Sequence, residues 1–77
     1  AGRFEEALAE ASAAARRDGR LYTARVVVAW VLLKLDRDEE ARTALGEARR
    51  IRPALSLVEI RRFFGQHTAE DLRALWI

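Results

Sequence analysis

Apolar residues in the first segment, 2–17, recur at spacings of three and four, which predicts an amphipathic helix. The apolar stripe consists of Phe4, Ala7, Leu8, Ala11, Ala14 and Ala15. Because most of these side chains are alanines, a neighbouring helix can approach closely, but little area is buried per residue. Asp18 and Gly19 end the segment, and we expect Gly19 to take the left-handed conformation typical of a helix C-terminus.

The second segment, 23–35, is apolar on every side between Val26 and Leu33. Consecutive valines favour a strand by propensity, and periodicity cannot separate a buried strand from a buried helix here. We predict a helix, because a lone strand among helices would have no partner for its backbone hydrogen bonds. Thr23 is the predicted N-cap. A helix that is hydrophobic all round should be buried all round.

The third helix is predicted to run to Ile51 and to end before Pro53, which cannot continue a helix. Its start carries a capping-box pattern, with Asp36 followed three residues later by Glu39. Its inner face consists of Ala41, Ala44, Leu45, Ala48 and Ile51.

Two shorter helices complete the chain. Ser56 and Glu59 form a second capping box, which opens a helix that runs to about residue 64 and ends at Gly65. Thr68 is the predicted N-cap of the last helix, 69–76, in which Asp71 stands at the third helical position.

A short motif occurs twice, 34 residues apart. Residues 3–7 read Arg-Phe-Glu-Glu-Ala, and residues 37–41 read Arg-Asp-Glu-Glu-Ala. At the same offset Ala14 recurs as Ala48 and Arg16 recurs as Arg50. A fixed period of this length indicates stacked helical hairpins, an architecture whose usual work is to hold another protein.

Residues in the second unit resemble the tetratricopeptide repeat family. Its second-helix pattern is matched by Ala41, Leu45, Ala48 and Pro53. The first helix departs from that pattern, because Arg25 replaces a common Trp, Val28-Ala29 replaces Leu-Gly, and Leu32 replaces Tyr.

The resemblance implies an all-α fold of antiparallel helical hairpins, with about five helices in a short right-handed solenoid. Residues 1–77 are then a single domain fragment of a longer protein. Within it, 2–19 is the second helix of a partial repeat, 22–55 is one full repeat, and 56–77 is a C-terminal capping hairpin.

The resemblance also implies a concave groove lined by the first helix of the full repeat. The groove residues that it implies are Thr23, Val26, Trp30, Leu33 and Lys34. Val26 and Trp30 stand where the resemblance would require polar residues for the family's clamp on a terminal carboxylate. An apolar groove suits an amphipathic helix or an extended apolar peptide of a protein partner. The alternative is that Val26 and Trp30 are buried by the following helix or by another copy.

The incomplete array predicts self-association, since stable solenoids need about three repeats. The first helix lacks its own partner helix, so its stripe should be exposed at Phe4, Leu8 and Ala11. We expect the fragment to form a homo-oligomer, most simply a two-fold dimer.

Charge argues against nucleic acid as a partner. The net charge is only +2, and the 13 arginines alternate with acidic turns, which is typical of solvated helix faces. The alternative is a small helical DNA-binding domain that uses Arg61 and Arg62, although the adjacent Phe63 and Phe64 should be core. The longest apolar run is shorter than the roughly 20 residues that span a membrane.

No catalytic, cofactor or metal site is predicted. His67 is the only histidine and there is no cysteine, so converging ligands are lacking. The lack of cysteine favours a reducing, cytoplasmic location, and the arginine and alanine excess is typical of GC-rich bacterial coding. Residues 52–75 resemble the C-terminal region of bacterial multidomain proteins with a class III adenylate cyclase or winged-helix domain, which makes a regulatory tail of a cyclase a further alternative.

Overall fold

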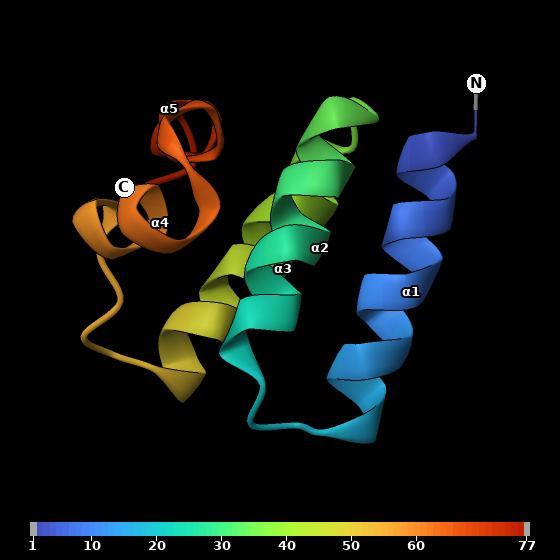
Figure 1. The fold of residues 1–77 in the computed structure, drawn as a ribbon, viewed down its shortest axis with the longest axis horizontal. Helices are drawn as coiled ribbons and strands as arrows, with labels where there is room; N and C mark the ends of the chain where they lie inside the picture. The colour runs from blue at the N-terminus through green and yellow to red at the C-terminus, as the bar shows by residue number, and fades with distance from the viewer. Residues whose placement is uncertain (1, 77) are drawn as a thin grey trace.

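The computed structural model describes residues 2–76 and contains α-helices joined by short loops, with no strand in this part of the chain. The helices are α1 (Arg3–Arg17), α2 (Tyr22–Lys34), α3 (Asp38–Ile51), α4 (Leu57–Phe64) and α5 (Gln66–Arg73) (Figure 1). The predicted all-α fold with five helical segments is confirmed, and the right-handed solenoid stays a prediction. The predicted domain bounds also include Ala1 and Ile77, which lie outside the described residues.

Helix α2 is the centre of the fold. It packs against α1, α3 and α5, so the valine-rich segment is a helix with neighbours on three sides. Val26 and Ala29 are completely buried, and Val31 is nearly so. A helix without a polar face is stable here because other helices cover most of its circumference.

One continuous core joins α2, α3 and the C-terminal hairpin. Its largest fully buried side chains include Leu45, Ile60 and Leu72, from α3, α4 and α5. Alanines on α2 and α3, such as Ala29 and Ala48, allow these two helices to approach closely. By contrast, only Ala15 is buried on α1, which packs against α2 alone.

Helix starts agree only in part with the predicted caps. The Ser56 hydroxyl accepts a hydrogen bond from the Glu59 amide at 3.2 Å, which is one half of the predicted capping box, whereas the Glu59 carboxylate accepts from Arg52 and Tyr22. Thr23 and Thr68 are wrong as N-caps, because α2 and α5 begin earlier and enclose both residues. Asp36 is also wrong, since it has a positive φ of 60° in the loop and α3 begins after Arg37.

Glycine conformations differ from expectation at one helix end. Asp18, in an extended conformation, ends α1, and Gly19 does not have positive φ. Gly65 does, with φ 100°, and this conformation lets a single residue join α4 to α5. The hairpin that results contacts α2 through α5 and lies on the side of α2 away from α1 (Figure 1).

Candidate functional site

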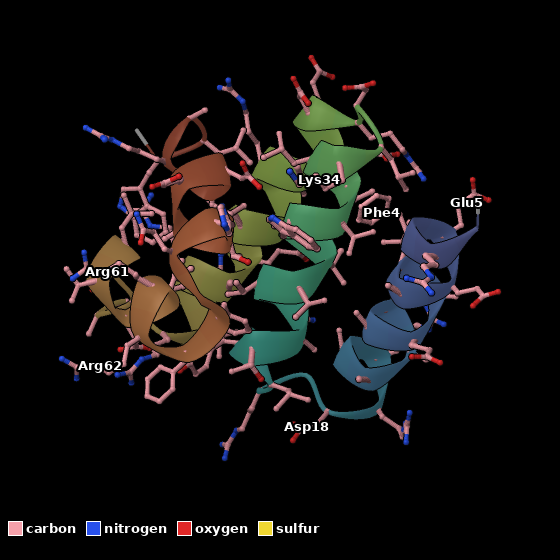
Figure 2. The ribbon with its side chains drawn as sticks, turned by 45° about the horizontal axis from the view of Figure 1, so that its top comes forward. Phe4, Glu5, Asp18, Lys34, Arg61 and Arg62 are labelled. Carbon is pink, nitrogen blue, oxygen red and sulfur yellow. The ribbon has the colours of Figure 1, made fainter. Side chains whose placement is uncertain are left out.

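One face of α2 is the candidate site. Thr23, Val27, Trp30 and Lys34 are spaced by four, three and four residues, so they lie along the same side of the helix. This side is bordered by α1 on one flank and by the α4–α5 hairpin on the other (Figure 2). The face therefore lies between α1 and the hairpin, and we call this face, with the groove over its Thr23 end, the channel.

At its Thr23 end the channel is an open groove of ≈ 500 Å³. Its lining consists of Ala7, Glu10, Ala11 and Ala14 from α1, Leu21, Thr23, Ala24 and Val27 from the start of α2, and Phe64 from α4. Most of these side chains are small and apolar, so the backbone of a bound segment could approach closely. Glu10 is the single charged residue among them.

At its Lys34 end the channel closes on a cluster from three helices. The Phe4 ring of α1 meets the Trp30 indole edge to face, with ring centroids 5.9 Å apart. The Trp30 Nε1–H donates to Asp71 Oδ2 of α5 at 2.9 Å. Lys34 Nζ lies 2.7 Å from the same oxygen and 5.4 Å from the indole centroid. Trp30 is therefore held in one orientation by all three helices.

The ion pair with Lys34 lowers the pKa of Asp71. The hydrogen bond from Lys34 is the largest cause, the bond from Trp30 adds to it, and partial desolvation opposes both. The carboxylate is therefore charged at neutral pH and fastens α5 to α2.

A second polar cluster fastens α4 at the other end of α2. Arg52 donates two hydrogen bonds of 2.7 Å to the Glu59 carboxylate, and the Tyr22 hydroxyl donates a third of 2.9 Å. The bonds from Arg52 lower the pKa of Glu59, and the bond to Glu59 raises the pKa of Tyr22. These contacts fix α4, and with it one wall of the channel, against the start of α2.

The structure places the predicted groove residues in two groups. Thr23 lines the groove, while Trp30 and Lys34 lie on the same face at its closed end. Val26 is wrong as a groove residue, because it is completely buried in the core, and Leu33 packs against that core. Val27 takes the expected place of Val26, since it lies four residues from Thr23.

Sequence reasoning missed the channel walls. Ala7 and Ala14 belong to the predicted stripe of α1, but nothing in their spacing showed that they face a groove. Phe64 and Asp71 reach the channel from α4 and α5, and such contacts across more than 35 residues carry no local signal.

The predicted self-association residues all face α2 or the channel. Phe4 is 41% exposed and contacts Trp30, Leu8 packs against the core, and Ala11 lines the groove. Contacts inside the chain thus account for part of the apolar surface of α1 that was expected to be exposed.

Exposed side chains on α4 differ from the expected core. Phe63 is 66% exposed and Val58 is 58% exposed, so the prediction that Phe63 is core is wrong, while Phe64 is half-buried. Arg61 and Arg62 point outward on the same short helix (Figure 2).

Within residues 2–76, no three of the histidine and carboxylate side chains converge to hold a metal ion. His67 is exposed near the start of α5. In the same part of the chain, none of the helices combines the length and apolar character needed to cross a membrane.

Comparisons with known proteins give no relative. Neither a family model, nor a curated protein, nor a solved structure matches the chain.

Proposed function

We propose that the chain is a non-catalytic protein-interaction module of the tetratricopeptide-like kind, whose channel over α2 holds an amphipathic helix of a partner protein. The observation that carries this proposal is the open, mostly apolar groove that Ala14, Val27 and Phe64 line from three different helices. Grooves of this kind bind amphipathic helices through their apolar face.

A helix fits this groove better than an extended peptide. The groove is lined by helices, whose backbone groups are already paired within each helix. An extended segment placed there would leave its own N–H and C=O groups without partners, at a cost of about 1–3 kcal/mol for each buried group. A helix satisfies these groups internally and presents side chains only.

The lining also indicates the chemistry of the partner. Small residues on α1 leave room for medium-sized apolar side chains at spacings of three and four. Glu10 is the charged group of the groove, whereas Lys34 and Asp71 already pair with each other. The preferred helix therefore has an apolar face with one basic residue beside it.

The test is selection from a displayed library of amphipathic helical peptides, followed by fluorescence anisotropy with the enriched sequences. Ala14→Arg places a long charged side chain in the groove, and Ala74→Arg adds the same charge at an exposed position outside it. We expect Ala14→Arg to weaken binding by about tenfold or more, a loss of roughly 1.4 kcal/mol. Ala74→Arg should leave binding unchanged.

Two results would overturn this proposal. One is selection of peptides without an apolar helical stripe. The other is equal binding by Ala14→Arg and wild type, which would place the partner on another surface. Trp30→Ala extends the test to the closed end of the channel, where unchanged binding by a folded variant would make Trp30 a core residue only.

A second candidate function is DNA binding through α4. It is favoured by the exposure of Arg61, Arg62 and Phe63, which leaves the α4 surface free to meet a phosphate backbone. A band shift with duplex DNA at ~50 mM salt that weakens steeply with added salt would support it. No shift under that condition would exclude it.

We also propose a cellular location and a parent protein for this module. A cytoplasmic location, supported by the lack of cysteine, and a place in a larger bacterial signalling protein, supported by the likeness of the tail, fit a module whose whole activity is binding. A regulatory tail of a cyclase would use the same channel.

A further inference from the structure

The outer face of α1 is charged at both ends and has no partner helix. It carries Glu5 and Glu6 in its first turn and Arg16 and Arg17 in its last turn, all exposed. Glu5 lies at the outer edge of the molecule (Figure 2). Among residues 2–76, the ion pairs are Lys34–Asp71, Arg37–Glu40 and Arg52–Glu59, so these four charges are unpaired within the described chain.

The charges follow a self-complementary order. Glu5, Ala9, Ala13 and Arg17 are spaced by four residues and form one row along the helix. Glu6 and Arg16 lie beside the two ends of this row. Glu5 lies as far before position 11 as Arg17 lies after it, and Glu6 and Arg16 are related in the same way.

We propose that two copies of the chain associate through this outer face, with their α1 helices antiparallel about a two-fold axis at position 11. Glu5 of one copy then lies opposite the second copy's Arg17, and Glu6 lies opposite its Arg16. Ala9 lies opposite Ala13, and these small side chains let the two helices approach closely. A two-fold interface uses one surface twice, so each charge pair forms twice.

The row on α3 shows that this order is more than the usual charge preference of helix ends. At the offset of 34 residues, the row reads Glu39, Thr43, Glu47 and Ile51. An antiparallel copy of α3 would bring Glu39 opposite Ile51 and leave Glu47 without a cation. Both rows have an acid in the first turn, as helix dipoles favour, but only the row on α1 complements itself.

This interface leaves the groove free. Ala7, Ala11 and Ala14 turn toward the channel, whereas Ala9 and Ala13 are absent from its lining. The dimer is therefore independent of the proposed partner helix, and the two proposals can fail separately.

The test is sedimentation equilibrium of the 77-residue chain and its charge-reversed variants. One helix face buries less than the ~1,200 Å² of a standard interface, so concentrations should extend to about 1 mM at ~50 mM salt. We expect a wild-type dimer that weakens several-fold at ~500 mM salt. Glu5→Arg/Glu6→Arg alone and Arg16→Glu/Arg17→Glu alone should each lose at least about tenfold in dimer affinity, because like charges then meet.

Mixing the two variants provides the decisive measurement. One then carries four positive charges on this face and the other four negative charges, so an equimolar mixture should form a heterodimer. The matched control is Glu39→Arg/Glu47→Arg, which makes the same charge change on α3 and should dimerise like wild type. Circular dichroism checks that every variant is folded.

Three results would overturn the proposal. They are a wild-type monomer at about 1 mM, a dimer unaffected by either reversal, and folded variants that do not associate when mixed. Ala14→Arg should keep the dimer, so failure of peptide binding and failure of dimerisation remain distinguishable.

Discussion

Asp71 shows how one side chain can connect helices that are far apart in the sequence. Its carboxylate accepts from the Trp30 indole and pairs with Lys34, so one acidic group on α5 satisfies two donors of α2. The bond also gives the indole, a large apolar group with one polar atom, a partner for its N–H at the partly buried channel end. Asp71 therefore sets both the position of α5 and the shape of the closed end.

Two substitutions of Asp71 should separate the hydrogen bond from Trp30 and the ion pair with Lys34. Asp71→Ala removes the acceptor and the ion pair, and we expect a loss of about 1 kcal/mol after allowing for the better helix propensity of alanine. Asp71→Asn keeps an acceptor for Trp30 and should lose about half as much. Urea unfolding in a Trp76→Phe background measures both, because Trp30 is then the only tryptophan. Equal stability of the alanine variant and wild type would contradict this role.

Acid should destabilise the chain through the same carboxylates. Asp71 and Glu59 have pKa values below their ordinary 3.8 and 4.5 in the folded chain. As the pH falls, the unfolded state takes up protons first, so the stabilisation is complete above about pH 5 and is lost below it. Urea midpoints between about pH 2 and 7 should show this decline, and Glu59→Gln/Asp71→Asn should flatten it. An equally steep decline in the double variant would place the acid sensitivity elsewhere.

At the scale of the helices, the sequence predicts interiors better than ends. All five segments were predicted, but the valine-rich α2 was predicted to be a helix because a lone strand would have no hydrogen-bond partner, not because of its apolar spacing. Ser56 is a correctly predicted cap, since its hydroxyl accepts a hydrogen bond from the Glu59 amide. Thr23 and Thr68 are also hydroxyl residues ahead of a predicted helix, but Tyr22 and Gln66 extend their helices upstream, where tertiary contacts and the Gly65 turn decide.

The candidate site, too, could be predicted from the sequence only in part. Of the groove residues that the resemblance implied, Thr23, Trp30 and Lys34 lie on the channel face of α2. Val26 is buried in the core and Leu33 packs against it. The walls of the channel could not be predicted, because they depend on how α1 and the α4–α5 hairpin sit against α2. Asp71 is the clearest example, since a cap-like position in the sequence gave no hint of a bond to Trp30.

The two residues predicted as caps of the short helices, Ser56 and Thr68, should therefore differ in their effect on stability. Ser56→Ala removes the bond that the Glu59 amide donates, and it should lower the free energy of unfolding by about 1 kcal/mol. Thr68→Ala removes no cap and should change stability by less than about 0.5 kcal/mol. Chemical unfolding of the two variants side by side gives the comparison, and an equal loss in both would restore Thr68 as a cap.

Two glycines should respond in opposite directions to alanine. Gly65 has φ 100° and ψ 163°, a region that only glycine occupies readily, so Gly65→Ala should cost about 1–3 kcal/mol. Gly46 lies inside α3 with open space around an added methyl group, so Gly46→Ala should stabilise by about 0.5–1 kcal/mol. Thermal melts should shift by about 4–8 °C for each kcal/mol in a domain of this size. A neutral Gly65→Ala would mean that the α4–α5 turn can relax.

For the molecule as a whole, stability should be uneven along the chain. The core joins α2, α3, α4 and α5, and the Tyr22 and Asp71 clusters fasten the hairpin to the rest. Helix α1 contributes one buried alanine, touches only α2, and ends on an open groove. Local opening occurs where few apolar contacts are buried, so α1 can detach while the other helices remain packed.

Hydrogen exchange of the native chain measures this difference. We expect the amides of α1 to exchange at least about tenfold faster than those of α2 and α3, which corresponds to opening that costs roughly 1.4 kcal/mol less. A selected helical peptide should slow exchange in α1 because it fills the groove between α1 and α2. Dimerisation should slow it through the opposite face, and Glu5→Arg/Glu6→Arg should abolish only that second effect. If α1 exchanged together with α2 in the free monomer, α1 would be part of the cooperative core, and an interface would not be needed to hold it in place.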